Sequence, residues 1–422
     1  MPWQRPAYSL LFRAAYAGAW PVLALRRMTN PKFRDEMRQR LGDPGFTVEN
    51  HPRAAKGVVW IHAASVGELA AGEPVIKALM ATGGFDVVLS TTTVAGRDLA
   101  KKRFPGLAAT FLLPLDLPGA VDRTFSAVRP RCLVLLETEI WPNLLWRAAR
   151  DNTPVVILNG RVSPRSFRRY RLVRGTLAAA LPAVRAFGMR SAADADRIRT
   201  LGAPPDRVTI TGNMKFDQAR MTAAALRDTP PSPESLLVAG STHPGEEKIL
   251  LGAFATLRET HPDLRLVLVP RHITRAGAVT ALVKAAGLRF ALFTHARDRR
   301  SWPEVLVVDT LGDLPRLFAQ ATIVFIGGSL VPHGGHNLLE PAALGRPVLF
   351  GPHMENFEDE TRAVLATGGG LRIRDGRHLS DALAFLLAND AEREHMGEDA
   401  EKAVRTNLGA VARNMGLLEQ YL

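Results

Sequence analysis

The chain has very little cysteine: Cys132 is the single one among its 422 residues. One cysteine excludes a disulfide framework and a zinc site built from thiolates. Cys132 lies in the apolar run Cys-Leu-Val-Leu-Leu, which favours an inert core residue. We therefore expect a protein of a reducing, cytoplasmic compartment.

Several common functional motifs are also absent. The sequence contains no G-x-G-x-x-G, Walker A, H-E-x-x-H or G-x-S-x-G motif. Their absence disfavours a dinucleotide-dependent oxidoreductase and a P-loop NTPase. His333 and His336 lie three residues apart, but no nearby cluster of carboxylates or thiolates completes a metal site, so we expect no metal there.

Acidic residues are outnumbered by basic ones. The 54 Lys and Arg against 41 Asp and Glu leave a net charge of +13, with a pI near 10.5. Such a balance predicts an anionic partner, which could be nucleic acid, acidic lipid or a phosphorylated small molecule. The apolar fraction of 46% and the charged fraction of 23% exclude a disordered chain, a polytopic membrane protein and a fibrous repeat.

The N-terminal segment 7–25 is an apolar window close to the length that spans a bilayer. It contains Arg13 and Pro21, has no small-residue cleavage site after it, and is followed by a basic stretch up to residue 40. This pattern predicts a short membrane anchor or an in-plane amphipathic helix, with the rest of the chain on the cytoplasmic side. The alternative is a soluble helix packed on the body of the protein.

Apolar, β-branched runs alternate with helical stretches along the rest of the chain. Such alternation predicts parallel sheets covered on both faces. The expected strands are 57–62, 86–90, 132–136, 154–158, 208–211, 236–239, 265–269, 304–308, 322–326 and 347–350. The Pro-rich segment 218–235 predicts a linker between two domains that enclose a cleft. The resulting boundaries are an anchor at 1–40, a first domain at 41–217, the linker, a second domain at 236–400 and a C-terminal helix at 401–422 that can pack back on the first domain.

The glycine-rich segment 327–341 is the most informative stretch of the second half. It follows an expected strand and precedes a helix, where glycines let the backbone approach a ligand and free amides can bind phosphate. Glu340 could then reach ribose hydroxyls. The alternative is a glycine-rich turn with Asn337 as helix N-cap.

Three carboxylates follow expected strands of the first half. Glu68, in Ser65-Val-Gly-Glu68, is a candidate general base, although Ser-x-x-Glu is also a capping box. Glu137 and Glu139 directly follow an apolar strand and would share one face if the backbone is extended. Segment 161–174 carries six Arg and no acid, which fits a solvated loop or a phosphate-binding patch beside a membrane.

Together these motifs resemble one family, the 3-deoxy-D-manno-octulosonic acid (Kdo) transferases of lipopolysaccharide assembly. The matching segments run in family order over about residues 5–420, and include HAASVGELAAGEPVIKAL, LLETEIWPNLL, NGRVSPRSFRRY, TGNMKFD, VAGSTHPGEE, LVPRH, FIGGSLVPHGGHNLLEP and GPHMENF. The resemblance implies a GT-B fold: two Rossmann-like parallel-sheet domains facing across a cleft. It also implies transfer of Kdo from CMP-Kdo to the lipid A precursor lipid IVA at the cytoplasmic face of the inner membrane.

The resemblance also implies roles for individual residues. Glu68 would be the base that deprotonates the attacking hydroxyl, with Glu137 and Lys215 as supporting catalytic groups. CMP-Kdo would be a donor substrate, with no cofactor and no metal. The residues implied for donor binding are Pro270, Arg271, Leu311, Gly312, Asp313, Asn337, Leu338, Leu339 and Glu340, and Leu311-Gly312-Asp313 replaces the family's Met-Gly-Glu-like triplet.

Two other functions compete with this one. A GT-B relative, such as a sugar-nucleotide epimerase or a different glycosyltransferase, would share the fold but leaves ETEIWPN and the N-terminal segment unexplained. A basic nucleic-acid-binding or membrane-scaffold protein would need one continuous basic stripe with interleaved aromatics. Only 7% of the residues are aromatic, and the cations gather at 26–40 and 161–174, so we expect no nucleic-acid partner.

Overall fold

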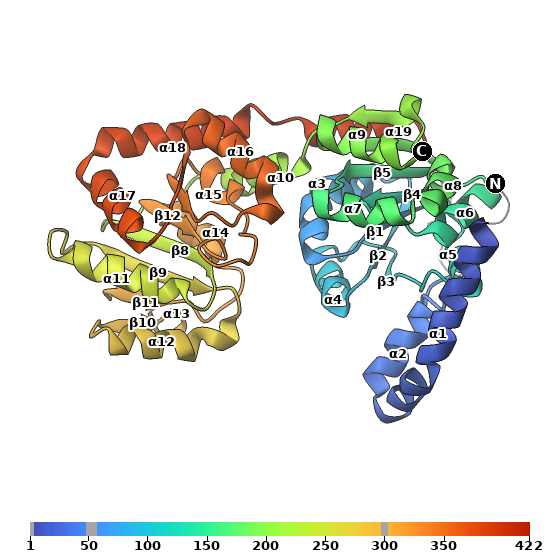
Figure 1. Ribbon diagram of the computed structural model, residues 1–422, viewed down its shortest axis with the longest axis horizontal. Coiled ribbons are helices and arrows are strands. Elements are labelled where there is room, and N and C mark those ends of the chain that lie inside the picture. Colours follow the sequence, from blue (N-terminus) through green and yellow to red (C-terminus); the bar gives the residue numbers. More distant parts are fainter. Residues whose placement is uncertain (1–3, 48–56, 297–302) are drawn as a thin grey trace. The chain divides into compact units, whose positions relative to one another are not determined.

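The computed structural model describes residues 4–47, 57–296 and 303–422. Parts of the predicted segments 1–40, 41–217 and 236–400 therefore lie outside the described residues. The chain forms two compact units, one made of residues 1–214 and 409–422 and the other of residues 215–408. In each unit a parallel sheet is flanked by helices (Figure 1).

The first unit contains a seven-stranded parallel sheet in the order β3-β2-β1-β4-β5-β6-β7. Its central strands are nearly continuous apolar runs that are buried on both faces, as expected for a parallel sheet, whereas Thr209 and Ile210 of the edge strand β7 are exposed. The order reverses between β1 and β4, and ligands of such sheets bind outside the carboxyl ends of the strands near this point. The strands are β1 Val58–Ala63, β2 Asp86–Thr91, β3 Ala109–Leu112, β4 Pro130–Leu136, β5 Val155–Gly160, β6 Val184–Met189 and β7 Val208–Ile210.

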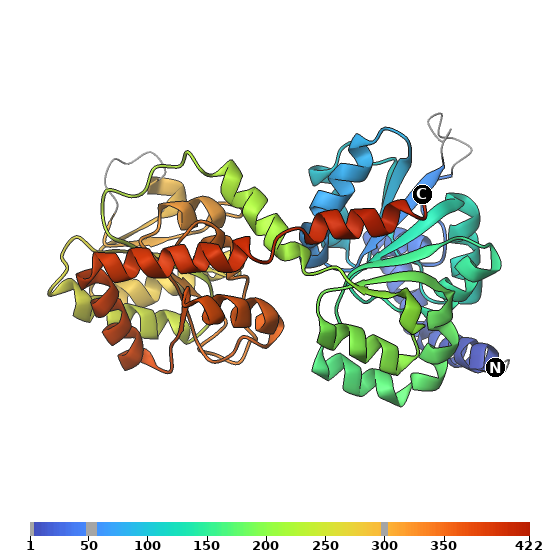
Figure 2. The same cartoon turned by 90° about the horizontal axis from the view of Figure 1, so that it is seen from above.

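Helices cover both faces of this sheet and bury two apolar clusters. One cluster contains Trp60, Phe111 and Phe125, and the other contains Ile61 and Leu69. The helices are α1 Gln4–Thr29, α2 Pro31–Arg40, α3 Val66–Ala81, α4 Val94–Arg103, α5 Pro118–Val128, α6 Pro142–Arg150, α7 Pro164–Leu172, α8 Arg174–Ala180, α9 Ala192–Leu201 and α19 Ala410–Glu419. The last of these, drawn in red in Figure 2, contacts α3, β5 and β6.

The second unit has its own seven-stranded parallel sheet, in the order β10-β11-β9-β8-β12-β13-β14. Its strands are β8 Leu236–Thr242, β9 Arg265–Pro270, β10 Phe290–Leu292, β11 Val305–Val307, β12 Ile323–Ile326, β13 Val348–Phe350 and β14 Gly370–Arg372. Its helices are α10 Met214–Ala225, α11 Glu246–Arg258, α12 Ala276–Ala285, α13 Phe293–Ala296, α14 Leu314–Gln320, α15 Leu339–Ala343, α16 Glu358–Thr367, α17 Gly376–Ala388 and α18 Asp390–Arg405. The two units together have the α/β architecture of a GT-B-like protein.

Every apolar run expected as a strand is a strand in the structure. Four further strands, β3, β6, β10 and β14, were not predicted. The linker prediction at 218–235 needs correction, because residues 218–225 belong to α10, whose Phe216, Ala219 and Ala223 are buried in the core of the second unit. The C-terminal stretch is likewise two helices, α18 in the second unit and α19 in the first.

The apolar N-terminal window lies within α1. The start of this helix is packed on the first unit, where the Tyr8 hydroxyl donates to Asp116 Oδ2 at 3.0 Å and Ser9 Oγ donates to Asn143 Oδ1 at 2.7 Å. Further along, large apolar side chains are exposed, among them Leu10, Leu11, Val22, Leu25 and Met28. Within the described residues, no helix combines the length and the apolar composition that crossing a bilayer requires. The membrane-anchoring role of α1 stays a prediction.

Candidate active site

Glu68 lies at the junction between β1 and α3, at the carboxyl edge of the first sheet. Ser65 is the N-cap of α3, and its Oγ accepts from the Glu68 backbone N–H at 3.2 Å. The Glu68 carboxylate in turn accepts from the Ala64 backbone N–H at 2.7 Å and from the Ser65 hydroxyl at 3.2 Å. The predicted capping box is therefore present, and it fixes the orientation of the carboxylate.

The surroundings of Glu68 favour its protonated form. Burial, followed by the negative charges of Glu137 and Glu139, raises the pKa of Glu68 to about 8, although its hydrogen bonds from Ala64 and Ser65 act in the opposite direction. A carboxylate with a pKa near the working pH binds a proton far more readily than an ordinary glutamate. This is the property that a general base requires.

Glu137 follows β4 directly and adopts a left-handed backbone, with φ of 57°. The backbone is therefore not extended between Glu137 and Glu139. The side-chain alternation of a strand consequently does not determine where the two carboxylates point. Glu137 instead forms an ion pair with Arg190, whose side chain is 2% exposed. No local sequence pattern indicated Arg190 as a partner, because Arg190 follows β6, a strand that was not predicted. Since Arg190 also donates to Asn159 O at 3.2 Å, it is held firmly in place.

Glu139 has different partners on the same side of the sheet. The Trp141 indole N–H donates to Glu139 Oε2 at 2.9 Å, and His62 Nε2 lies 3.6 Å from the same oxygen. Burial and then the charge of Glu139 raise the pKa of Tyr170, on α7. The three carboxylates that the sequence singled out thus share one region of the first unit, together with a buried imidazole.

Lys215 belongs to the second unit, whereas Glu68 and Glu137 belong to the first. Its Nζ lies 3.5 Å from Glu360 Oε1 and 4.8 Å from the centre of the Phe357 ring. The Glu360 side chain is 3% exposed, so Lys215 supplies the positive charge that this buried carboxylate needs.

The glycine-rich loop after β12 is held by a single buried side chain, Glu246 of α11. Its carboxylate accepts four backbone N–H groups: those of His243 at 2.9 Å, Gly328 at 2.7 Å, Ser329 at 3.0 Å and Leu330 at 2.9 Å. A Cβ at Gly327 would lie 2.4 Å from Ser241 O, so the loop approaches β8 too closely for any side chain there. The loop is therefore rigid where it leaves the sheet.

Four histidines gather beside this loop. The His243 ring is stacked on His333 with a centroid distance of 4.1 Å, and its Nε2 lies 2.9 Å from His336 Nε2. His272 meets the His243 ring edge-on at 6.3 Å. Burial, followed by the charge of Arg271 and the neighbouring histidines, lowers the pKa of His336 to about 4. Burial also lowers the pKa of His243, so the His243 and His336 rings are suited to hydrogen bonding as neutral groups, with Arg271 as the nearby cation.

Sequence reasoning considered only His333 and His336 of this cluster. His243 and His336 are 93 residues apart in sequence, and only the adjacency of β8 and β12 brings them together. Among the described residues, no group of three or more His, Cys, Asp or Glu side chains has an arrangement that could hold a metal ion.

The other predicted donor-binding residues follow strands of the second sheet. Pro270 ends β9 and Arg271 follows it, while Leu311, Gly312 and Asp313 precede α14. Leu311 is 76% exposed. The Asn337 amide donates to Glu340 Oε1 at 3.0 Å, and Asn337 Oδ1 accepts from the Leu339 N–H at 3.1 Å. The prediction for Leu338 and Leu339 needs correction, because both side chains are fully buried in the core of the second unit. Only the backbone of these two residues could contact a ligand.

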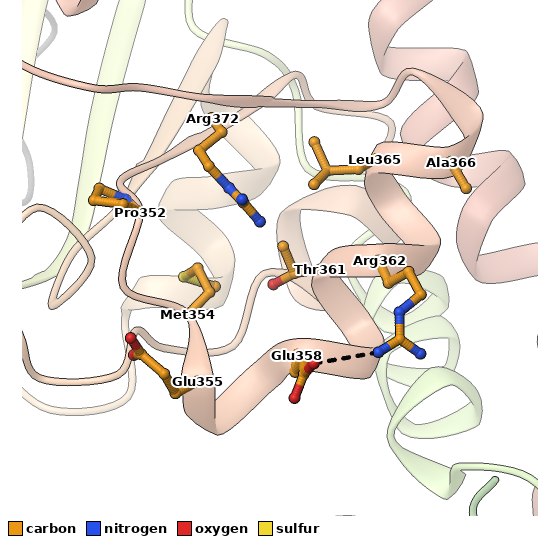
Figure 3. A pocket seen from close by; sticks show the side chains of 9 residues that line it. All are labelled: Pro352, Met354, Glu355, Glu358, Thr361, Arg362, Leu365, Ala366 and Arg372. Carbon is orange, nitrogen blue, oxygen red and sulfur yellow. Dashed lines mark hydrogen bonds and ion pairs between the residues drawn. The ribbon is translucent and has the colours of Figure 1, made fainter. Parts of the chain in front are cut away.

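A hollow of about 630 Å³ opens between α16 and the carboxyl ends of β13 and β14 (Figure 3). Arg372 and Arg362 reach its sides, Met354 and Leu365 supply apolar walls, and Glu358 pairs with Arg362 at 3.4 Å. The hollow lies at the same sheet edge as the histidine cluster, two strands further along. A sizeable ligand bound at this edge could therefore extend into it.

The arginine-rich segment 161–174 forms α7 and the turn into α8. No residue of α7 is buried, and five of the six arginines of the segment are exposed. Leu172 is 87% exposed and Val173 is 51% exposed at the end of the segment. The segment thus presents positive charge and apolar side chains on one exposed stretch.

Comparison with known proteins identifies the family. The family model for 3-deoxy-D-manno-octulosonic-acid transferase (kdotransferase) matches residues 35–218. The 3-deoxy-D-manno-octulosonic acid transferase of Haemophilus influenzae is 32% identical over 95% of this chain and 94% of its own length. That of Bordetella pertussis is 34% identical over 88% of this chain and 89% of its own.

A solved structure supports the fold assignment. The crystal structure of UDP-GlcNAc 2-epimerase from Neisseria meningitidis bound to UDP-GlcNAc covers 86% of this chain and 99% of its own, with a TM-score of 0.60 at 14% identity. At that identity the likeness concerns the fold alone. The fold therefore does not distinguish an epimerase from a glycosyltransferase, whereas the sequence comparisons do. On the sequence comparisons, the chain belongs to the 3-deoxy-D-manno-octulosonic acid transferase family.

Proposed function

We propose that this protein transfers Kdo from CMP-Kdo to the lipid A precursor lipid IVA, with Glu68 as general base and without a metal ion. The observation that carries the proposal is the environment of Glu68, a half-buried carboxylate with a raised pKa, in a chain of the Kdo transferase family. In the proposed step, Glu68 takes the proton of the acceptor hydroxyl. The hydroxyl oxygen bonds to the anomeric carbon of Kdo, and the bond from that carbon to the CMP phosphate breaks.

The second unit supports the donor part of the proposal. CMP-Kdo carries a phosphate and a carboxylate, and both need positive charge or N–H donors. Arg271 offers positive charge, and His243 and His336, whose pKa values are lowered, offer ring N–H donors at the same sheet edge. CMP is a good leaving group, so positioning and charge stabilisation suffice for catalysis by residues of this kind.

Exposed side chains of the first unit support the acceptor and the location. Lipid IVA is a bis-phosphorylated glycolipid, and the exposed arginines of segment 161–174 match its phosphates. The exposed apolar side chains of α1 fit a helix that rests in the headgroup region of a bilayer. We therefore propose that the protein works at the cytoplasmic face of the inner membrane.

The direct test is incubation of the purified protein with CMP-Kdo and lipid IVA, followed by mass analysis of the lipid product. The expected product carries one or more added Kdo groups, and CMP is released in the same number. Parallel reactions with UDP sugars should consume no donor, and added EDTA should leave the rate unchanged. Consumption of a UDP sugar, or no product from CMP-Kdo, would contradict the proposal.

Glu68→Gln tests the base. General base catalysis contributes about 10²–10⁴-fold, so we expect turnover to fall by at least about 100-fold while CMP binding persists. In the unmodified protein, kcat/KM should rise with pH through about 8, because Glu68 acts as a base only when ionised. Glu419→Gln, an exposed glutamate of α19, is the matched control. A Glu68→Gln variant with nearly full activity would remove Glu68 from the mechanism.

A further inference from the structure

His62 is a fully buried histidine that the proposed reaction does not use. It lies on β1, and its Nδ1 is 3.1 Å from Ser90 O and 3.0 Å from Ser90 Oγ, on the neighbouring strand β2. Its Nε2 is buried without a hydrogen-bond partner among the described residues. The group facing this nitrogen is the Glu139 carboxylate, at 3.6 Å.

Ser90 can satisfy His62 Nδ1 whether or not that nitrogen carries a proton. The Ser90 carbonyl accepts from a protonated Nδ1, and the Ser90 hydroxyl can donate to a bare one. The Trp60 indole N–H donates to the same hydroxyl oxygen at 2.7 Å, which leaves the hydroxyl proton free to turn toward His62. The ring can therefore gain or lose a proton without leaving Nδ1 unsatisfied.

The opposite ring nitrogen has no such freedom. An unprotonated Nε2 would direct its lone pair at the Glu139 carboxylate, whereas a protonated Nε2 donates toward it. With a proton on Nε2, the buried ring nitrogen and the half-buried Glu139 carboxylate attract each other instead of directing lone pairs at each other. Trp141 already donates to Glu139 Oε2, and a protonated His62 Nε2 would be a second donor facing the same oxygen.

We propose that His62 is a positioning residue for the base: its ring carries a proton on both nitrogens, and this positive charge offsets the negative charge that Glu139 presents to Glu68. The role rests on the proposed function of Glu68. Four other groups surround the pair: Glu137 with its Arg190 partner after β6, Tyr170 on α7, and Ser90 on β2. Because Glu137 has its own cation in Arg190, Glu139 is the carboxylate whose charge depends on His62.

Variants of the pair should change the pH dependence of the rate in different ways. Glu139→Gln removes the negative charge together with the proton on His62 that offsets it, so the rising part of the kcat/KM pH profile should stay within about 0.2 unit of its position in the unmodified protein. His62→Gln keeps a polar group but cannot hold a charge, so the charge of Glu139 is no longer offset and the rising part of the profile should shift to higher pH by at least about 0.5 unit. That shift corresponds to an approximately threefold loss of kcat/KM at pH 7.

The double variant separates this role from a merely structural one. With no charge at position 139 there is nothing for His62 to offset, so the double variant should reproduce the Glu139→Gln profile within about 0.2 unit. Glu419→Gln serves as the control that leaves the profile unmoved. The proposal is overturned if His62→Gln leaves the rising part of the profile in place, or if the double variant keeps the shift that His62→Gln causes.

A measurement without substrate keeps the inference independent of the proposed reaction and of the folding of His62→Gln. In ¹⁵N-histidine-labelled protein at pH 7, NMR should show both His62 ring nitrogens protonated, and Glu139→Gln should return the ring to a neutral form. A neutral His62 in the unmodified protein would refute the pair. If the pair is present by NMR but CMP-Kdo is not consumed, the proposed function fails and the pair stands.

Discussion

Glu246→Gln is the substitution with the largest effect that the structure allows to be worked out. The Glu246 side chain is fully buried, and its two oxygens accept four backbone N–H groups. A glutamine offers one oxygen and presents its NH₂ group to the other two donors. Two buried N–H groups then lose their acceptor, at about 1–3 kcal/mol each, so we expect a loss of about 2–6 kcal/mol in the stability of the second unit.

Two measurements check this prediction. Urea unfolding should report the free-energy loss, and hydrogen–deuterium exchange should report faster exchange at the Gly328, Ser329 and Leu330 amides. The loop that these residues begin also carries His336, so the KM for the donor should rise. Glu259→Gln, an exposed glutamate at the end of α11, is the matched control.

The outcome that refutes the reasoning is equally specific. An unfolding free energy within about 0.5 kcal/mol of the unmodified protein, together with unchanged exchange at residues 328–330, would mean that the four hydrogen bonds do not hold the loop.

Three further outcomes are expected. Arg190→Met leaves the Glu137 carboxylate unpaired and should cost about 3 kcal/mol in urea unfolding, with partial recovery in the double variant with Glu137→Gln; no recovery would contradict the ion pair. Tyr8→Phe removes the hydroxyl that donates to Asp116 and should cost about 1–3 kcal/mol, with faster proteolysis within α1; an unchanged digestion pattern would mean that this bond does not dock the helix. Replacing the exposed arginines of 161–174 by Gln should raise the KM for the bisphosphorylated acceptor about tenfold and leave that for a dephosphorylated acceptor unchanged; equal effects on both would exclude phosphate recognition.

The sequence predicted the strands that are rich in apolar, β-branched residues. Such residues are typical of strands that are buried on both faces of a parallel sheet. The missed strands have a weaker signal: β6 carries the exposed Arg185, and neither β10 (FAL) nor β14 (GLR) contains a β-branched residue. Local composition therefore identified the centres of both sheets better than their edges.

The site was predictable where its chemistry is local in sequence. Glu68 and its capping serine are three residues apart, and the spacing alone predicted their contact. Arg190 and Glu137 are 53 residues apart and meet through strand order, which no local pattern contains. The same holds for His62 and Glu139, which lie on one region of the sheet only because β1 and β4 are neighbours.

The first unit is assembled from two separated stretches, and this affects its biosynthesis. Residues 409–422 bring Asn414 into the core, where its Oδ1 accepts from the Asn159 N–H at 3.2 Å and from the Thr211 hydroxyl at 3.1 Å. At a translation rate of about 5–20 residues per second, these residues emerge about 10–40 s after the rest of the first unit. The second unit is continuous in sequence and can fold during that interval. The half of the protein that is made first is therefore the half that is completed last.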